Sequence, residues 1–224
     1  MRSDRSTFVP PDDPVLMNQV FDLDARLKEL DETVWRGEML SHRYGDVFVK
    51  LWDTLRHSTD PFRTLAGFPV GEITLGDGRT TSKHEHGVVV TKTGEPTRTL
   101  DAAGWRQQLT AWREAGYRLD ASEWRHPIFD PPTADAPARS TIRVTLFVEH
   151  PEKLERVTIR GDLQVVWTEP TDAAADPLPS RIDASRLEIT SRTGAPMFEP
   201  LVSKVVMPFT NLIFIGPLMA YDLD

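Results

Sequence analysis

The chain has 224 residues, of which 39% are hydrophobic and 27% charged, close to the composition of an ordinary globular protein once its 13 glycines are counted as apolar. Its net charge of −8 argues against a general nucleic-acid binder, because phosphate binding needs a clustered basic surface. The lack of cysteine excludes disulfides, thiolate metal sites and a cysteine nucleophile.

Neither a signal peptide nor a membrane span is expected from the sequence. It lacks the apolar core of a signal peptide, and no apolar run in the chain approaches the length of a membrane span. Residues 1–14 are rich in Pro and Asp and are expected to form a disordered or extended leader. As written, the chain is expected in the cytoplasm, whereas export is expected if it is a fragment of a longer protein.

Two amphipathic helices are predicted next, with apolar stripes of different width. The first helix carries a narrow heptad seam of Leu16, Val20, Leu23, Leu27, Leu30 and Val34. Because the seam is shorter than three heptads, we expect this helix to pack along its own domain, with the joining of two copies as the alternative. The second helix, which ends before Pro61, has a wide stripe of Tyr44, Val47, Phe48, Leu51, Trp52 and Leu55.

Strand-like segments and a third helix follow. Two short strands are predicted at residues 71–76 and 85–92, with a turn at residues 77–82 between them. The third helix is predicted to run from Asp101, a good N-cap, to Gly116, a good C-cap. A further strand is predicted at residues 117–129.

Strict alternation of apolar and polar residues marks three later segments, at residues 140–150, 156–167 and 185–192. This pattern is typical of antiparallel strands with one packed face and one solvated face. The order of elements therefore predicts an α+β domain of two layers, with helices packed on the apolar face of the sheet. The solvated face carries side chains of both signs, which we expect to pair across strands: Arg143, Glu149, Arg160, Asp162, Gln164, Arg186, Glu188 and Arg192.

Over residues 15–195 this order of elements resembles the NTF2-like (SnoaL and ketosteroid-isomerase-like) fold, in which helices fill the concave side of a curved antiparallel sheet. The resemblance implies a pocket between helices and sheet, where some relatives act as isomerases, dehydratases or hydrolases. The candidate lining residues are Tyr44, Trp52, Trp105 and Tyr117, and the alternative is that these aromatic residues fill the core. A homodimer through the outer sheet face or the N-terminal helix is a further expectation.

The segment FTNLIFIGPLMAYDLD at residues 209–224 resembles the beginning of an FG-GAP or VCBS-type repeat, in which an apolar strand leads into D-L-D-G-D-G. In that family the repeats build β-propeller blades, and the Asp-rich loop binds calcium. Asp222 and Asp224 match the first two ligand positions, whereas the glycine and the later ligands are absent. The resemblance implies a C-terminal extension over residues 196–224, no cofactor in the chain as given, and calcium binding only in a longer form.

The stretch KHEHG at residues 83–87 is the main candidate for metal chemistry. On a strand, His84 and His86 would share one face, where two imidazoles can hold zinc or iron with a third ligand. The candidate third ligands are Glu123, His126, Glu149 and His150, and the alternative is a solvated strand edge.

The sequence favours a non-catalytic interaction or ligand-binding module at the front of a larger calcium-binding repeat protein. The alternative is a small enzyme that uses the concave pocket, with Asp46, His84 or His86 as acid–base or metal groups. No nucleophile elbow, nucleotide loop or helical zinc motif supports the enzyme.

Overall fold

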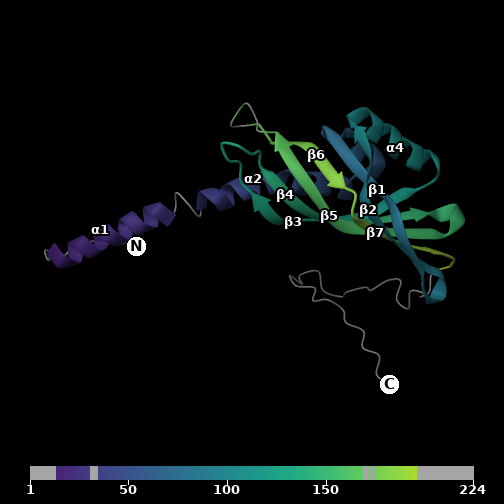
Figure 1. Ribbon diagram of the computed structural model, residues 1–224, viewed down its shortest axis with the longest axis horizontal. Coiled ribbons are helices and arrows are strands. Elements are labelled where there is room, and N and C mark those ends of the chain that lie inside the picture. Colours follow the sequence, from purple (N-terminus) through teal and green to yellow (C-terminus); the bar gives the residue numbers. More distant parts are fainter. Residues whose placement is uncertain (1–13, 31–34, 169–171, 173–174, 196–224) are drawn as a thin grey trace, which may run out of the picture. The chain divides into compact units, whose positions relative to one another are not determined.

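The computed structural model describes residues 14–30, 35–168, 172 and 175–195. The described residues form four α-helices and one curved sheet of seven strands (Figure 1), which confirms the predicted α+β class. The chain divides after Gly194. Nearly all of the predicted leader and all of the predicted C-terminal extension lie outside the described residues.

The helices are α1 (Pro14–Leu30), α2 (Arg36–Arg56), α3 (Pro61–Gly67) and α4 (Ala102–Glu114). In α2 the predicted stripe is buried, apart from Trp52, which is half-buried. Asp101 caps α4 by accepting a hydrogen bond from the backbone N–H of Gly104, as predicted. None of these described helices is both long and apolar enough to cross a membrane.

Helix α1 differs from the other three because its described side chains, residues 21–29, are all exposed. Over these residues the prediction that the helix packs along its own domain is wrong. A stripe of two residues in seven is too narrow to cover a sheet, whereas the wide stripe of α2 suits that task.

Helix α3 is absent from the sequence prediction, which treats Pro61 only as the end of the preceding helix. Pro61 also begins α3, because its fixed φ suits the first turn of a helix and its missing N–H is not needed there. Asp60 caps the helix by accepting a hydrogen bond from the backbone N–H of Arg63 at 3.1 Å.

The strands are β1 (Glu72–Lys83), β2 (Val88–Asp101), β3 (Arg118–Asp130), β4 (Arg139–His150), β5 (Glu155–Thr168), β6 (Leu178–Ala184) and β7 (Leu187–Thr193). Their order in the sheet is β3-β4-β5-β6-β1-β2-β7, and β5 also pairs with β7. All neighbours are antiparallel except β1 and β6, so the sheet is mixed and the expectation of a fully antiparallel sheet is wrong at that pair.

The predicted turn at residues 77–82 is also wrong, because β1 runs through it and the chain reverses at Glu85–Gly87 instead. Gly76 and Gly78 mark irregularities in the β1–β2 register rather than a turn. Strand β6 is absent from the sequence prediction, which places no element between residues 167 and 185, where the chain is rich in Pro and Ala. Strands β3, β4 and β5 lie where strands are predicted, and β4 and β5 pair as antiparallel neighbours.

Strands β6 and β7 follow one another along β5, and the β1–β2 hairpin crosses the break between them. β1 pairs with β6 on one side of the break, and β2 pairs with β7 on the other. Thr93 of β2 fills the break: its hydroxyl donates to the Ser185 and Leu187 carbonyls and accepts from the Leu187 N–H at 2.7 Å. This crossing bends the sheet towards a partly closed, barrel-like form.

Gly76 lies at the crossing, where a Cβ atom would come within 2.3 Å of the Ser185 carbonyl oxygen and 2.7 Å of that of Gly94. We predict that Gly76→Ala lowers the free energy of unfolding by about 3 kcal/mol, because backbone atoms cannot move aside as side chains can. Urea unfolding measures the loss. The control is Gly37→Ala, where a Cβ atom meets nothing within 4 Å, and equal stabilities for the two variants would contradict the prediction.

Candidate functional site

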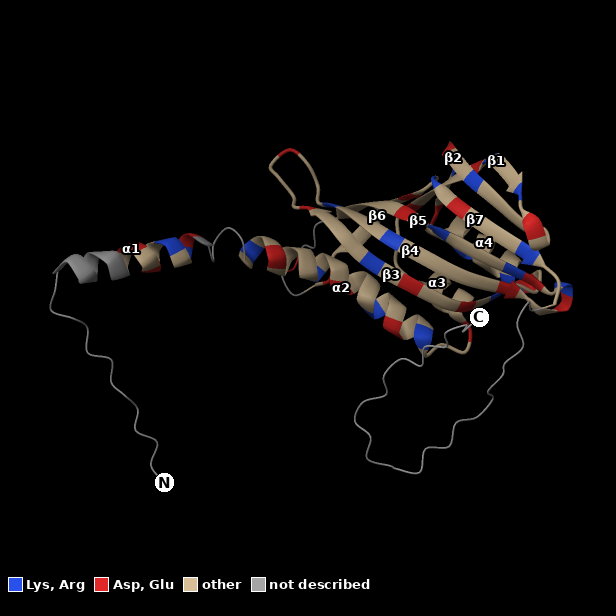
Figure 2. Ribbon diagram, turned by 90° about the horizontal axis from the view of Figure 1, so that it is seen from below, with Lys and Arg blue, Asp and Glu red and all other residues tan. Residues whose placement is uncertain are grey.

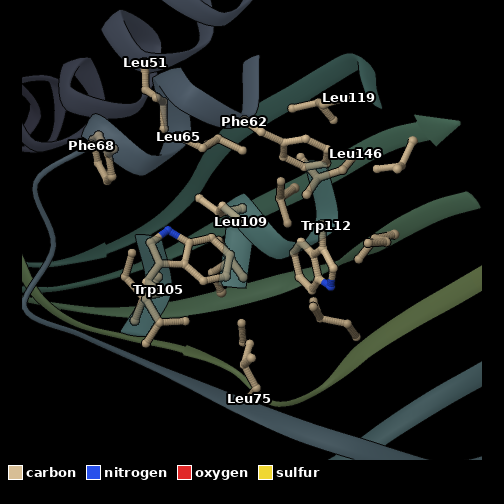
Figure 3. A pocket seen from close by; sticks show the side chains of 18 of the residues that line it. Leu51, Phe62, Leu65, Phe68, Leu75, Trp105, Leu109, Trp112, Leu119 and Leu146 are labelled. Atoms are coloured by element: carbon tan, nitrogen blue, oxygen red, sulfur yellow. The ribbon is translucent and has the colours of Figure 1, made fainter. Parts of the chain in front are cut away.

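A cavity of about 320 Å³ lies between the helices α2, α3 and α4 and the inner face of the sheet (Figure 3). The helices and the loop after α3 contribute Phe48, Leu51, Phe62, Leu65, Phe68, Trp105, Leu109 and Trp112 to its lining. The sheet and the turn before β3 contribute Ile73, Leu75, Tyr117, Leu119, Trp124, Val144, Leu146, Val148, Val157, Ile159, Leu163, Ile182, Ala184 and Leu187. Every one of these residues is aliphatic or aromatic.

The apolar lining follows directly from the alternation along β4 and β5. Every second residue of these strands faces inward, and the residues between them face the outer side of the sheet. Because the sheet is curved, the inward residues of neighbouring strands converge on one space.

Aromatic rings form much of the helical wall of the cavity. Trp105 and Trp112, about two helical turns apart on α4, meet edge to face with ring centres 6.1 Å apart. Phe62 of α3 lies 6.4 Å from Trp112, and Phe48 of α2 stacks on Trp124 of β3 at 5.5 Å. These contacts fix the rings against one another, so the wall does not depend on a bound molecule for its shape.

Tyr117 connects the cavity lining to polar groups at the end of β4 and the start of β5. Its hydroxyl donates a hydrogen bond to Oε2 of Glu155 at 3.0 Å, and its ring packs edge to face against His150 at 5.0 Å. The hydrogen bond to the Glu155 carboxylate, aided by burial, raises the pKa of Tyr117 above its usual value of 10.0. The hydroxyl therefore stays protonated near neutral pH and acts as a donor.

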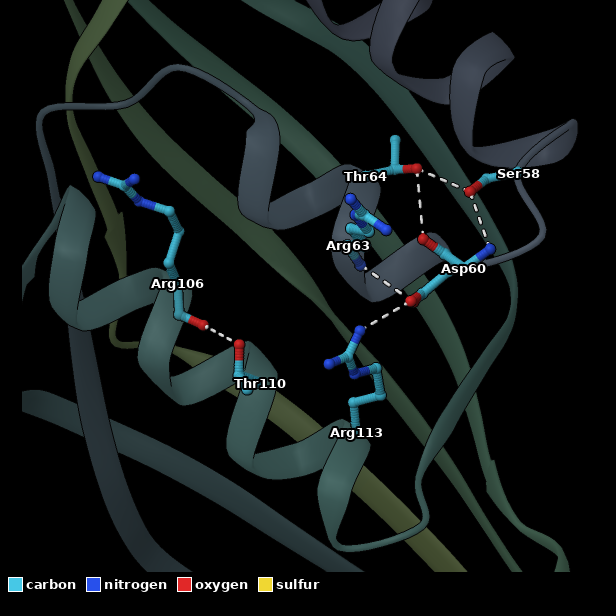
Figure 4. A network of polar contacts seen from close by, with 7 residues as sticks. All are labelled: Ser58, Asp60, Arg63, Thr64, Arg106, Thr110 and Arg113. Carbon is cyan, nitrogen blue, oxygen red and sulfur yellow. Dashed lines mark hydrogen bonds and ion pairs between the residues drawn. The ribbon is translucent and has the colours of Figure 1, made fainter.

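A polar network joins the start of α3 to the end of α4 (Figure 4), the two helices that supply much of the wall. Asp60 is its centre: Oδ1 caps α3, and Oδ2 accepts a hydrogen bond from Nη1 of Arg113 at 2.9 Å. Ser58 and Thr64 complete it, with their hydroxyl oxygens 2.7 Å apart. Burial of the carboxyl opposes ionisation, yet the N–H of Arg63 and the guanidinium of Arg113 outweigh it and lower the pKa of Asp60.

We predict that Asp60→Ala lowers the free energy of unfolding by about 1 kcal/mol, because α3 loses its N-cap and its tie to α4. Asp60→Asn keeps an oxygen that can cap the helix but loses the charge, so its effect should be smaller. Chemical denaturation measures both. Asp53→Ala, which removes an exposed carboxylate from α2, is the control and should leave stability unchanged. An Asp60→Ala variant as stable as this control would show that the network does not hold the wall.

The structure places the predicted pocket residues in two groups. Trp105 and Tyr117 line the cavity, whereas Tyr44 and Trp52 do not. Tyr44 is buried against Phe129 and Trp167, with ring centres 5.0 and 5.1 Å away, so it belongs to the core. Trp52 is half-buried at the surface of α2, where Arg56 lies over its ring at 5.9 Å.

The predicted acid–base and metal residues lie away from the cavity. Asp46 is on the exposed side of α2. His86 lies in the turn Glu85–Gly87, with φ 59°, and His84 precedes that turn. The prediction that the two histidines share one strand face is therefore wrong, because the hairpin reverses at this point.

The candidate third ligands are not gathered with these histidines. Glu123 is exposed on β3, Glu149 and His150 end β4, and His126 packs against α2. Among the residues that the structure describes, no three His, Asp or Glu side chains form a group that could hold a metal ion. Asp222 and Asp224, the candidate calcium ligands, lie outside the described residues.

Sequence reasoning missed the contributions of α3 and β6 to the lining. Phe62 and Leu65 come from α3, and Ile182 and Ala184 come from β6. The signal for α3 is Asp60 followed by Pro61, a cap residue before a proline at the first helical position. For β6 the proline-rich context hides the alternation that Ile182 and Ala184 share.

The outer face of the sheet carries charges of both signs on its strands (Figure 2), and several pair across strands as predicted. Arg143 of β4 is directly opposite Asp162 of β5, and their side chains meet at 2.8 Å. Arg160 of β5 is opposite Glu188 of β7, and they meet at 2.5 Å. The hydrogen bond to Arg143 lowers the pKa of Asp162 despite some burial. These exposed pairs are worth little individually because water screens them.

A small buried polar cluster fastens α2 to the sheet beside the cavity. Oγ of Ser140 accepts a hydrogen bond from the indole N–H of Trp167 and lies 2.9 Å from Nε2 of His126. The ring of His126 packs against Gly45 of α2, where a Cβ atom would come within 2.8 Å of Nδ1. Burial lowers the pKa of His126, although backbone hydrogen bonds with Ile128 and Ser41 partly oppose the effect.

The lowered pKa makes the stability depend on pH in a definite direction. The unfolded chain takes up a proton near pH 6.5, whereas folded His126 resists it until lower pH. We predict that this contribution to stability is complete above pH 6.5 and is lost as the pH falls from there through the folded pKa. His126→Gln should remove this loss of stability between pH 6.5 and pH 5. Urea unfolding from pH 5 to pH 8 measures the free energy of unfolding of both proteins.

His84→Gln is the matched control, since it removes an exposed histidine. The control should retain the slope of the unmodified protein between pH 5 and pH 6.5. If His126→Gln also keeps this slope, burial of His126 is not its cause.

Comparison with known proteins gives no family assignment: no family model, no curated protein and no solved structure matches this chain.

Proposed function

We propose that the protein is a non-catalytic binding module that holds one small, largely apolar molecule in the cavity between α2, α3, α4 and the curved sheet. The observation that carries the proposal is a cavity of about 320 Å³ lined by aliphatic and aromatic residues alone. The arrangement of helices on a curved sheet, which the resemblance to NTF2-like proteins implies, also supports it.

The size of the cavity indicates that a molecule occupies it. Protein interiors are packed as densely as organic crystals, and voids much larger than a water molecule are few. An unfilled apolar space lowers stability, because its lining loses contacts that solvent does not replace. A cavity at the lower end of the range for small-molecule sites is therefore explained best by a molecule that occupies it.

The chemistry of the lining sets the class of ligand. In another protein, an engineered apolar cavity of about 150 Å³ stays dry and binds benzene. Scaling from that case gives a ligand of roughly a dozen carbon atoms here. The hydroxyl of Tyr117 already donates its one proton to Glu155 and can only accept a further hydrogen bond, so one donor group on the ligand would suit that side.

An enzyme in the same cavity is the weaker alternative. Asp46, His84 and His86, its candidate acid–base groups, do not line the cavity. Among the described lining residues Tyr117 is the ionisable one, and its raised pKa makes it a poor base at neutral pH.

Binding is tested with 1-aminoanthracene, an uncharged fluorescent probe close to this size. We predict saturable binding with one site per chain and energy transfer from Trp105, Trp112 and Trp124, which line the cavity. Probe in excess should also raise the melting temperature, because it binds only the folded state.

A cavity-filling variant shows where the probe binds. Ala184 lines the cavity and Ala111 is on the exposed side of α4, so Ala184→Phe and Ala111→Phe make the same change in two environments. We predict at least a tenfold loss of affinity for Ala184→Phe, with folding checked by circular dichroism, and none for Ala111→Phe. Equal affinities, or no saturable binding to the unmodified protein, would contradict the proposal.

A further inference from the structure

Helix α1 presents an apolar seam that the described part of the chain does not cover. Leu23 and Leu27 occupy successive seam positions, and each is 58% exposed. All described side chains from residue 21 to residue 29 are exposed. Exposed leucines at regular helical spacing on an ordered helix indicate a partner rather than a solvated surface.

The spacing of the seam shows what kind of partner fits it. Apolar residues recur every three and four positions, which gives a narrow stripe with a period of 3.5 residues. Such a stripe is typical of a helix that packs along another helix, where each knob inserts into a hole of the facing helix. The stripe of α2 is wider, and its residues are buried in the core. The partner of α1 is therefore expected to be a helix.

The helices α2, α3 and α4 already use their apolar faces in the core and the cavity wall. A second copy of α1 offers the same narrow seam, and a twofold axis pairs identical seams without leaving one uncovered. We propose that α1 forms a parallel two-stranded coiled coil with α1 of a second copy of this chain.

The residues along the seam favour the parallel two-stranded form. Numbering the repeat from Leu16 as d places leucine at every d position within α1, at Leu16, Leu23 and Leu30. The a positions are Val20 and Leu27. Leucine at d with a β-branched residue at a, as at Val20, favours parallel dimers over trimers and tetramers, whereas Leu27 at the other a position does not add to this preference.

The length of the helix limits the strength of this association. Helix α1 has 17 residues, a little over two heptads. Helices only slightly shorter are marginal in water, so the pairing should stabilise α1 and depend on protein concentration. The pairing would join two modules by their N-terminal helices and leave both cavities accessible, because none of the lining residues belongs to α1.

The absence of cysteine from the chain permits a clean test of orientation. In a parallel pair the two copies of a d position face each other, at a separation that suits a disulfide. Leu23→Cys should therefore cross-link at least tenfold faster in a glutathione redox buffer than Ala25→Cys, whose site is on the far side of the helix. A non-reducing gel measures the product, at twice the monomer mass of 25.3 kDa.

Sedimentation equilibrium tests the seam without cross-linking. Leu23→Glu/Leu27→Glu should weaken the dimer at least tenfold, whereas Phe21→Glu/Ala25→Glu, with the same change in charge away from the seam, should not. Probe binding in the cavity reports that both variants remain folded.

Three outcomes would overturn the proposal. One is a monomer at every concentration from about 1 to 300 μM. The second is a dimer that the Leu23→Glu/Leu27→Glu variant does not weaken, which would place the contact elsewhere, for example on the outer sheet face. The third is equal cross-linking of the two cysteine variants, which would exclude the parallel register.

Discussion

The crossing of the β1–β2 hairpin over the break between β6 and β7 is the constraint on which the rest of the structure depends. Thr93 satisfies the backbone groups left open at the break, and Gly76 allows the strands to approach there. Because β1 joins β6 and β2 joins β7, the sheet must bend around β5. A flat sheet of the same sequence would have no concave side for the helices to cover.

The helices cover this concave side without filling it. Their aromatic side chains pack against each other, as Trp105 does with Trp112, and hold the wall away from the strands. Asp60 and Arg113 fix α3 to α4 at the surface, where a charged pair remains hydrated. The space is thus maintained by contacts within its own wall. That arrangement costs stability in the empty protein, and a ligand of the kind we propose would spend little binding energy on rearrangement.

The predictable parts of the fold are those specified by neighbouring residues. The alternation in β4 and β5 and the Asp101 cap of α4 are local signals, and both predictions are confirmed. The predicted turn near Gly76 is wrong because glycine serves both turns and close approaches of strands, and only the distant Ser185 distinguishes the two. Strand β6 was missed for a related reason, since Pro179 argues against a central strand unless the pairing partners are known.

The residues of the site also divide into those that neighbouring residues specify and those that depend on distant parts of the chain. Trp105 and Tyr117 follow from the helix α4 and the strand after it, so their place in the wall could be anticipated. Tyr44 and Trp52 belong to the same apolar stripe of α2 as Phe48 and Leu51, yet only the latter two line the cavity. Which part of a wide stripe faces a cavity and which faces solid core depends on the curvature of the sheet beneath it. Nothing within α2 itself encodes that difference.

The parallel pairing of β1 with β6 also has a consequence for how the chain folds. Glu72 of β1 pairs with Arg181 of β6, so β1 can form this pairing only after the ribosome has synthesised a strand near the end of the described domain. Contacts between such distant residues slow folding, because a long loop must close before they stabilise anything. During synthesis the aromatic faces of α2 and α4 therefore emerge well before the strand that completes their enclosure. In this interval the nascent chain exposes the same surface that later forms the cavity, and a chaperone or a ligand of the kind we propose would meet it there first.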